Sequence, residues 1–534
     1  MYMELLGVKE HVQKIWLQTK KQEVMKKTLI LFLSVMCLSS CVEDEGNYNY
    51  TELNKLTIEG LEESYNVLHN VDTIKIQPII TSTILGENLD NYEYQWHIHE
   101  GIGEHKHTVI SKEKDLVYPV DIKIGTYDLY FTVLDKTTGI KTMASAPMKV
   151  TTPTSKGFLL LGDDLEEGIM GLDMVIMPAG RDTSVMANAY DNSETRLKGA
   201  DRILYQGPRY NDTQSLWMCT DDGSFRMNNK EDISIISELN DFGMIEIANS
   251  FEIKRPMRIM DVFPHPTTTN RSGMNRGYMT EDVCVYAAIG SAEYFGTPVN
   301  RVNANTKKLF KFYPLAFMGG CVNNNYLGYA IIYNKDDNSF MYLGNYTAYA
   351  TALTDKAGDP FPWKQENRTI VWGGNSVNGT HGSSFTIMKE LDAEEYYLYK
   401  FKAGPANYNT TKEGAWKIDL SKAENFEKAS HYAVSGTGSI LMYAYGSTLY
   451  LYDYAYGDLL SRDMGGEITH LDIEYCSTGS RTAFVVATYN DTDKGIVRKL
   501  DVGTDPNKLE IIDRPKEVWH TRLRVKDVEW KKAY

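Results

Sequence analysis

Four histidines at short spacing form the most chemically distinctive cluster in the sequence. They are His97, His99, His105 and His107, and they flank residues 100–104. If Trp96 faces a core, strand alternation turns His97 and His99 outward. A loop over 100–104 then pairs His99 with His105 and His97 with His107 on one face of a hairpin. Imidazoles gathered in this way can bind Zn²⁺ or Cu²⁺.

The same register counts against a metal site. It turns Lys106 toward the core face, beside Ile98. The interpretation that we favour is therefore a solvated hairpin that happens to be rich in histidine, and the four histidines remain a candidate metal site only.

Catalytic motifs are absent from the sequence. It has no G-x-S-x-G elbow, no H-E-x-x-H and no phosphate-binding G-x-x-x-x-G-K-[ST]. Adjacent carboxylates occur at Asp163-Asp164, Glu166-Glu167, Asp221-Asp222 and Asp336-Asp337, and we interpret them as solvated turns. The sequence thus predicts no enzyme and no cofactor.

Four cysteines follow the N-terminal region, namely Cys219, Cys284, Cys321 and Cys476. An even number permits two disulfides in an exported protein. Each of them lies in or beside an apolar or aromatic stretch, so buried free thiols are the favoured interpretation.

Residues 25–41 have the three parts of a bacterial lipoprotein signal. Met25-Lys26-Lys27 is the positive start, residues 28–37 (TLILFLSVMC) are the apolar core, and Leu38-Ser39-Ser40-Cys41 is the cleavage site. The apolar run is too short for a membrane-spanning helix. Residues 1–24 carry no recognisable signal, so we expect Met25 to be the true start and residues 1–40 to be removed. Cys41 then becomes the lipid-attachment residue, which anchors the protein in the outer membrane.

An acidic cluster follows the anchor directly. Glu43, Asp44 and Glu45 resemble the surface-export signal of lipoproteins from Bacteroidota, which implies an outer-membrane protein facing the cell exterior. The alternative is that residues 41–52 are a soluble, flexible tether and that the acidic residues carry no export signal.

Residues 53–152 have the pattern of a β-sandwich. Period-two alternation occurs over 73–80, 92–98 and 126–135, with turn residues between the runs. About a hundred residues with strands at this spacing and a central Trp96 are typical of an immunoglobulin-like sandwich. The cysteine pair of true immunoglobulin domains is missing.

Two of these strands carry a family resemblance. Tyr94-Gln95-Trp96 and the run from Gly125-Thr126-Tyr127 to Asp135 resemble the strands of PKD-like domains. Together with the segment that begins at Cys41, residues 25 to about 150 resemble the PKD-like lipoprotein family of Bacteroidota. The resemblance implies a place beside Sus-type outer-membrane nutrient importers.

The linker 150–156 (VTTPTSK) separates this domain from residues 156–534, which repeat a hairpin unit. Examples are 216–227, 327–342, 440–453 and 483–500. Leu398, Leu441 and Phe484 follow at intervals of 43 residues. Such a period, filled by hairpins, is typical of propeller blades, and the length favours seven or eight of them. The alternative is an irregular pair of β-sandwiches.

The charge composition argues against one class of function. Fifty-six Lys and Arg against 71 Asp and Glu give a net charge of −15, without a basic block, which argues against nucleic-acid binding. The fold class expected is all-β, a PKD-like sandwich followed by a β-propeller-like domain.

Three functions fit these features. The leading expectation, from the resemblance, is a non-catalytic surface lipoprotein accessory to a SusC/SusD-type transporter complex, capturing glycan or peptide ligands. One alternative is a secreted propeller hydrolase or lyase acting on polysaccharide, and another is a surface adhesin or structural protein.

Overall fold

The computed structural model describes residues 54–532, except 85–88, 101–106, 207–214, 231, 240–250, 252–253, 255, 264–276, 287–295, 319–328, 345–346, 377–381, 405–409, 475–476 and 506–507. Throughout these residues the regular structure is β-strand, with a few short 3-10 helices, so the all-β prediction is confirmed. None of the described helices is long and apolar enough to cross a membrane. Cys41 and the acidic residues Glu43, Asp44 and Glu45 lie outside the described residues.

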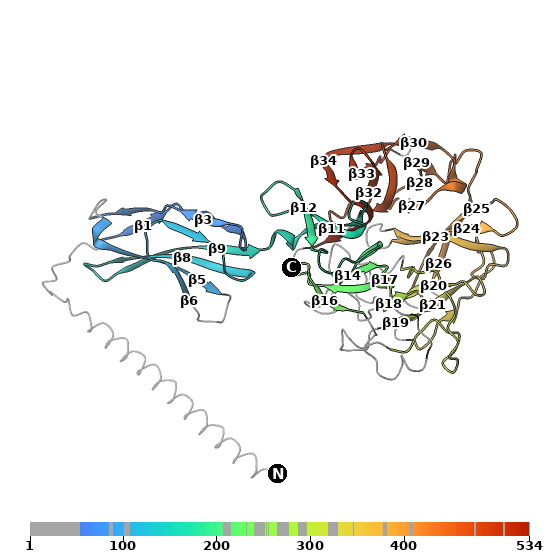
Figure 1. Cartoon of the computed structure of the whole chain (residues 1–534), viewed down its shortest axis with the longest axis horizontal. Coiled ribbons are helices and arrows are strands. Elements are labelled where there is room, and N and C mark those ends of the chain that lie inside the picture. The colour runs from blue at the N-terminus through green and yellow to red at the C-terminus, as the bar shows by residue number, and fades with distance from the viewer. Residues whose placement is uncertain are drawn as a thin grey trace, which may run out of the picture. The chain divides into compact units, whose positions relative to one another are not determined.

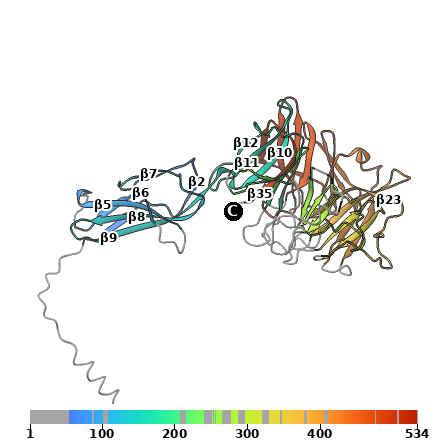
Figure 2. The same cartoon turned by 60° about the horizontal axis from the view of Figure 1, so that its bottom comes forward.

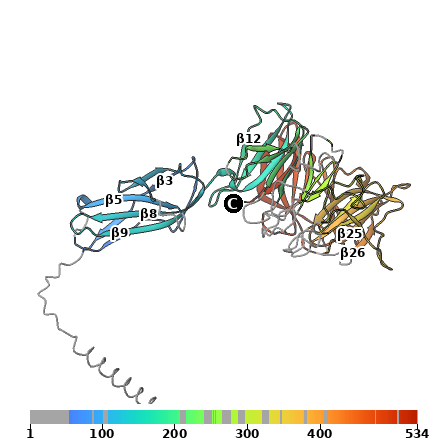
Figure 3. The ribbon, with the colours of Figure 1, turned by 90° about the horizontal axis from the view of Figure 1, so that it is seen from below.

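The strands of residues 53–152 form three sheets. A five-stranded sheet has the order β2-β9-β8-β5-β6, with β2 parallel to β9, and the pairs β1-β4 and β3-β7 form the other two. Figure 3 shows β5, β8 and β9 side by side. The elements are β1 (Leu56–Glu59), β2 (Tyr65–Leu68), β3 (Thr73–Ile76), β4 (Ile79–Ser82), η1 (Leu89–Asn91), β5 (Tyr92–Glu100), β6 (His107–Ser111), β7 (Leu116–Pro119), β8 (Gly125–Asp135), β9 (Lys141–Thr151) and η2 (Pro153–Ser155).

The prediction of a single strand over 73–80 is wrong. The strand is interrupted at Gln77–Pro78, and the two parts, β3 and β4, belong to different sheets. Proline lacks the N–H that a ladder requires, which explains the break.

Two compact units divide the described chain. The smaller contains β1, β4, η1 and the turn between β8 and β9, and the larger contains most other strands. In the smaller unit, Asp135 accepts hydrogen bonds from Asn54 (3.1 Å) and Asn91 (2.8 Å) and from the backbone N–H of Thr137 (2.8 Å). The aspartate that ends the PKD-like motif thus closes the turn after β8.

The predicted tryptophan core is confirmed in the larger unit. Trp96 is fully buried, and its ring centroid lies 4.4 Å from that of Phe131 on β8. Trp96 Nε1 donates a hydrogen bond to the Lys114 carbonyl at 3.1 Å, so the indole is satisfied despite its burial.

The described residues of 156–534 form seven sheets of three or four strands each (Figure 1). In the described residues, no sheet joins a strand of 53–152 to one of 156–534. In chain order the sheets contain: β10 (Gly157–Asp164), β11 (Ile169–Ile176), β12 (Ser184–Tyr190) with β35 (Arg524–Lys531); β13 (Ala200–Gln206), β14 (Ser215–Thr220), β15 (Gly223–Met227), β16 (Ile235–Glu238); β17 (Ile259–Phe263), β18 (Gly277–Thr280), β19 (Cys284–Tyr286); β20 (Ala330–Asn334), β21 (Ser339–Leu343), β22 (Thr351–Ala352); β23 (Arg368–Ser376), β24 (Ser383–Glu390), β25 (Tyr396–Lys402), β26 (Thr411–Lys417); β27 (His431–Val434), β28 (Ile440–Tyr445), β29 (Thr448–Asp453), β30 (Leu459–Asp463); and β31 (Glu467–Ile473), β32 (Ala483–Asn490), β33 (Lys494–Val502), β34 (Ile511–Thr521). The 3-10 helix η4 (Phe426–Lys428) precedes β27.

The predicted hairpins are confirmed. They correspond to the pairs β14-β15, β20-β21, β28-β29 and β32-β33. The 43-residue interval is confirmed in part, because Leu441 and Phe484 lie on the second strands of their sheets, whereas Leu398 lies on the third strand, β25.

The last strand of the chain pairs with the first strand of this region. β35 runs antiparallel to β10, with Phe158 opposite Trp530 and Leu161 opposite Asp527. Figure 2 shows β10, β11, β12 and β35 together. Phe158 and Trp530 are buried, with ring centroids 4.8 Å apart.

A buried lysine ends this strand. Lys531 is 1% exposed, and its Nζ donates a hydrogen bond to the Ser155 carbonyl at 3.1 Å. Because burial disfavours the charged amine, the pKa of Lys531 falls to about 8 from its usual 10.5.

We expect this lysine to make stability rise with pH. Between about pH 8 and pH 10.5 the unfolded chain holds a proton that the folded chain has lost, so the free energy of unfolding increases with pH, by about 3 kcal/mol in total. Urea denaturation of the wild type and Lys531→Met across this range measures the effect, since the difference between the two cancels other titrating groups. A difference that stays constant with pH would contradict it.

One of the adjacent carboxylates departs from the sequence prediction. Asp164 is buried rather than solvated, and it forms an ion pair with Arg522 at 2.6 Å. Asp221, Asp336 and Asp337 do lie in hairpin turns and are exposed. Cys219 and Cys284 are buried free thiols, as favoured, and Cys321 and Cys476 lie outside the described residues.

Candidate functional site

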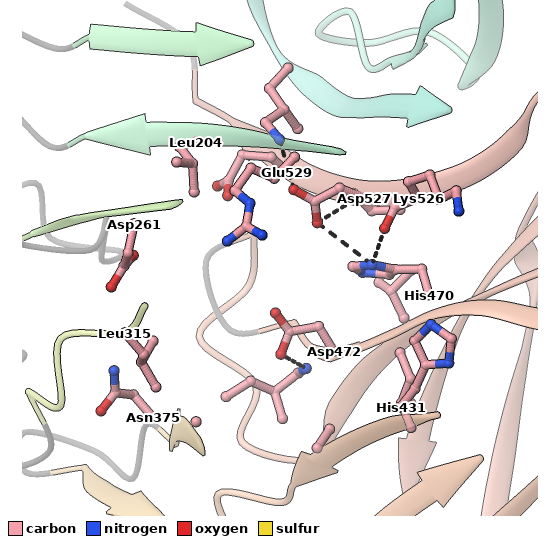
Figure 4. Close-up of a pocket in the computed structure, with 18 of the residues that line it drawn as sticks. Leu204, Asp261, Leu315, Asn375, His431, His470, Asp472, Lys526, Asp527 and Glu529 are labelled. Carbon is pink, nitrogen blue, oxygen red and sulfur yellow. Dashed lines mark hydrogen bonds and ion pairs between the residues drawn. The ribbon is translucent and has the colours of Figure 1, made fainter. Parts of the chain in front are cut away.

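One cavity is lined by strands from six of the seven sheets. It has a volume of about 740 Å³ and lies against β13, β17, residues 313–318, β23, β27, β31 and β35. Residues 313–318 do not form a strand, but an isolated β-bridge between Phe317 and Ile331 connects them to β20. The cavity therefore receives an edge strand from six sheets and, beside the sheet of β20, this bridged segment. Figure 4 shows side chains from these strands facing a shared space.

Consecutive lining strands contact one another. β31 contacts β35, β35 contacts β13, β13 contacts β17, and β23 and β27 contact each other, as do β27 and β31. The segment 313–318 is tied to its neighbours by hydrogen bonds. Ala316 N–H donates to Asp261 on β17 at 2.8 Å, and Met318 N–H donates to Asn375 on β23 at 3.0 Å.

Most lining strands contain a β-bulge. The register shifts beside Asp201 on β13, Met260 on β17, Val371 on β23, Thr469 on β31 and Lys526 on β35. A bulge adds one residue to a strand and redirects the side chains that follow it. Strict alternation therefore fails at the cavity wall, which lets polar side chains face the cavity from strands that also bury apolar residues.

Two aspartates connect lining strands of neighbouring sheets. Asp527 on β35 accepts the backbone N–H of Ile203 on β13 at 2.8 Å, and its other oxygen lies 3.6 Å from His470 Nδ1 on β31. Asp261 plays the same part between β17 and Ala316. Each also accepts the N–H of the residue that follows it, Val528 or Val262. Burial raises the pKa of Asp527, although His470 and the Ile203 N–H act in the opposite direction.

We expect Asp527→Ala to destabilise the fold by about 2–3 kcal/mol, since the Ile203 N–H then loses its acceptor. Asp527→Asn retains an acceptor oxygen and is expected to cost clearly less. The free energies of unfolding of both variants, from urea titration, measure the difference. If both variants lose the same free energy of unfolding, the hydrogen bond from the Ile203 N–H is not the cause of the destabilisation.

Glu529 is a carboxylate of the cavity wall that is not neutralised by a described basic side chain. It lies on β35, faces the cavity and, within the described part of the chain, forms no ion pair. Burial raises its pKa well above the usual value, and Asp527, Asp472 and Glu474 raise it further. Glu474, by contrast, is paired with Lys499.

Two histidines lie on adjacent strands of the wall. His470 on β31 places Nδ1 3.3 Å from the Lys526 carbonyl. His431 on β27 has Nδ1 2.8 Å from Ser430 Oγ. Burial and the neighbouring His470 lower the pKa of His431 to about 4, so His431 is neutral at physiological pH.

Aromatic side chains also line the cavity. Trp372 on β23 and Tyr432 on β27 are half-buried, with ring centroids 6.0 Å apart. Tyr313 accepts the Gly373 N–H at 3.1 Å, which connects residues 313–318 to β23.

The sequence analysis missed these cavity residues. A usable signal is the recurrence of Asp before a β-branched residue on lining strands, at Asp261-Val262, Asp472-Ile473 and Asp527-Val528.

The histidine hairpin forms with another register than predicted. His99 pairs with His107, and His97 therefore lies opposite Val109. The rings still gather, with the His107 centroid 5.0 Å from that of His99 and 5.4 Å from that of His97. Within the described residues no group of three or more His, Cys, Asp or Glu side chains is arranged to hold a metal, and His105 lies outside them.

Comparison with known proteins finds a family model that matches the N-terminal part. Residues 41–199 match the model of the PKD-like family. This PKD-like region includes the Tyr94-x-Trp96 and Gly125–Asp135 strands that carry the resemblance in the sequence. No curated protein matches the chain.

Solved structures give weaker likenesses. A quinonprotein alcohol dehydrogenase-like protein from Bacteroides thetaiotaomicron is 13% identical with a TM-score of 0.34, and the match covers 89% of this chain and 99% of that one. YCF48 from Cyanidioschyzon merolae is 9% identical with a TM-score of 0.34, covering 65% of this chain and 95% of that one. At these TM-scores neither likeness bears on the function of the chain.

Proposed function

We propose that the chain is a non-catalytic lipoprotein of the outer cell surface, accessory to a Sus-type importer, which captures ligands in its cavity. The observation that carries the proposal is the cavity of about 740 Å³, which is lined by edge strands of six sheets of residues 156–534 and by the segment 313–318 bridged to the seventh. Ligand sites of proteins usually have volumes of about 300–1,000 Å³, and they combine apolar walls with a few polar groups.

The seven sheets are, in this proposal, the blades of a β-propeller. The lining strands are the innermost strands, and the cavity follows the propeller axis. The pairing of β35 with β10 supports the propeller arrangement, because a propeller closes when the first and last strands of its sequence join in one blade. Seven sheets favour the lower of the two predicted blade numbers.

Placement at the cell surface rests on the sequence and on the family match. The match to residues 41–199 supports the PKD-like part of the resemblance, and the link to an importer follows from that resemblance alone. The lipid on Cys41 supplies the anchor, and Glu43, Asp44 and Glu45 supply the export signal.

We expect Cys41→Ala to prevent lipidation, because the thiol is the site of attachment, while Cys37→Ala leaves lipidation unchanged. Labelling of cells with radioactive palmitate measures both variants. Label retained by Cys41→Ala would refute the anchor. With Glu43, Asp44 and Glu45 replaced by Ala, lipidation is retained but protease added to whole cells no longer digests the protein.

Affinity purification of the tagged full chain from membranes tests the function. A co-purifying large β-barrel transporter, together with binding of small glycans or peptides to the purified chain, is expected. A chain that binds neither transporter nor small ligand would favour the adhesin alternative.

A second candidate, a polysaccharide hydrolase or lyase, is favoured by Glu529. A carboxyl group that stays protonated near neutral pH can act as a general acid, and burial among other carboxylates raises the pKa of Glu529 in that direction. New reducing ends released from polysaccharides by the wild type, and not by Glu529→Gln, would establish this activity over capture.

A further inference from the structure

We propose that the cavity recognises the ammonium or guanidinium group of a cationic ligand, and that Glu529, Asp472 and His470 bind this group. This inference rests on the proposed capture function. The three side chains come from β35 and β31, and all face the cavity (Figure 4). The inference concerns the chemistry of the ligand, which the proposed function leaves open between glycan and peptide.

Negative charge is in excess around the cavity. Six carboxylates line it, against three permanently positive side chains, and the nine are Asp201, Asp261, Asp472, Glu474, Asp527, Glu529, Arg202, Arg524 and Lys526. Two of the positive charges are already paired, Arg202 with Asp201 and Arg524 with Glu467, and Glu474 is paired with Lys499 from outside the lining. A positively charged ligand would reduce this imbalance, whereas an anionic ligand would increase it.

His470 supplies an independent indication of a ligand. Its side chain is more than nine-tenths buried, and Nε2 has no hydrogen-bond partner among the described residues. Figure 4 shows the ring extending into the space between Asp472 and Asp527. A buried polar atom without a partner is costly, so a ligand donor at this point would recover the lost hydrogen bond.

The surroundings of His470 determine what Nε2 can do. Nδ1 faces two acceptors, the Lys526 carbonyl at 3.3 Å and the Asp527 carboxylate at 3.6 Å. Nδ1 is therefore the nitrogen that carries the proton, and in the neutral ring Nε2 is left as an acceptor. The acceptor set of His470, Asp472 and Glu529 matches the several N–H donors of an ammonium or guanidinium group.

Glu529 gives this set its selectivity for charge. Glu529 is half-buried near Asp527, Asp472 and Glu474, and its ionised carboxylate is unfavourable there unless a proton or a cation compensates it. A cationic ligand therefore replaces a proton on Glu529, which a neutral ligand does not do. The rings of Trp372 and Tyr432 in the same wall offer cation–π contacts to such a group.

Ammonium groups occur in lysine side chains and in glucosamine, so the test has two arms. Isothermal titration calorimetry of the full chain uses end-capped trilysine and the glucosamine trimer as probes. Each is compared with its N-acetylated form, which keeps the backbone and removes the charge. At least one amine probe is expected to bind tenfold or more tightly than its acetylated form, and the arm that does so identifies the source.

Two variants locate the site. Glu529→Gln keeps the shape and hydrogen-bonding capacity of the side chain but removes its charge, and it is expected to weaken binding of the amine probe at least tenfold. Glu510→Gln is the control, because Glu510 pairs with Lys508 outside the cavity and its loss is expected to leave affinity unchanged. Far-ultraviolet circular dichroism and thermal melts confirm that both variants fold.

Proton release on binding distinguishes direct contact of Glu529 with the ligand from a purely structural role of Glu529, because a structural role would not change the number of protons released. In two buffers of different ionisation enthalpy, the wild type is expected to release a proton when the amine binds, and Glu529→Gln is not. The charged and titratable groups around Glu529 are Asp527, Lys526, Arg524, His470, Asp472, Glu474, His431, Lys499, Asp201, Arg202 and Asp261. His431 is held neutral by burial, so it does not compete as the proton source near neutral pH.

The outcomes separate this inference from the proposed function. Acetylated probes that bind as tightly as the amines, or full affinity in Glu529→Gln, would overturn the cationic ligand and leave capture of neutral ligands standing. No binding of either amine probe would overturn the inference as well. Loss of the co-purifying transporter, by contrast, bears on the proposed function alone.

Discussion

Truncation of the chain after Arg522 is expected to abolish the folded state of residues 156–534. It removes β35, which pairs with β10 along its whole length, and with it the buried side chains of Leu523, Val525 and Trp530. Each of these contributes roughly 1.5–3 kcal/mol through burial. Their sum is comparable to the whole stability of a typical domain, about 5–15 kcal/mol. The truncation also leaves one edge of β10 unpaired, which favours aggregation.

Thermal melts followed by circular dichroism, with light scattering for aggregation, measure this effect. Truncation after Lys532 is the matched control, because it leaves β35 complete and is expected to melt like the full chain. A chain ending at Arg522 that melts cooperatively at the temperature of the control would contradict the role of β35.

The second large effect concerns a buried ion pair. Lys499 and Glu474 are 1% and 6% exposed at their side chains, and Lys499 also contacts Ser477 Oγ at 2.6 Å. Lys499→Met is expected to lower the free energy of unfolding by about 3–5 kcal/mol, because it leaves the Glu474 carboxylate buried without a counter-charge. Urea denaturation at neutral pH measures the loss.

Two comparisons test the cause of that loss. The double variant Lys499→Met with Glu474→Leu removes both charges and is expected to recover much of the stability. Lys508→Met breaks an exposed pair with Glu510 and is expected to cost less than about 1 kcal/mol. If the double variant is as unstable as Lys499→Met alone, lost packing rather than an unpaired charge is responsible.

Local patterns made much of the fold predictable. The hairpin β28-β29 follows from apolar alternation on both sides of a short turn, all within a few residues. The pairing of β35 with β10 was also predictable, since the two strands lie at the two ends of a repeating region. Prediction failed at two places: Pro78 divides one expected strand into two, and the hairpin pairs His107 with His99 rather than with His97.

The cavity could not be predicted for a related reason. Asp261 and Asp527 look like ordinary polar residues of alternating strands, and their positions depend on bulges that a single sequence does not reveal. Their hydrogen-bond partners, Ala316 and Ile203, lie far away in the chain. Asp164 was misjudged likewise, because its partner Arg522 is supplied by the other end of the domain.

The pairing of β10 with β35 has a consequence for how the protein is made. Gly157 lies opposite Lys531, so one sheet needs the first and the last strand of residues 156–534. A ribosome releases the chain from its N-terminus, and this sheet cannot be completed until β35 emerges. Contacts this distant in sequence also form slowly. The fold of residues 156–534 is therefore completed only after β35 has been synthesised, even if the other sheets form earlier.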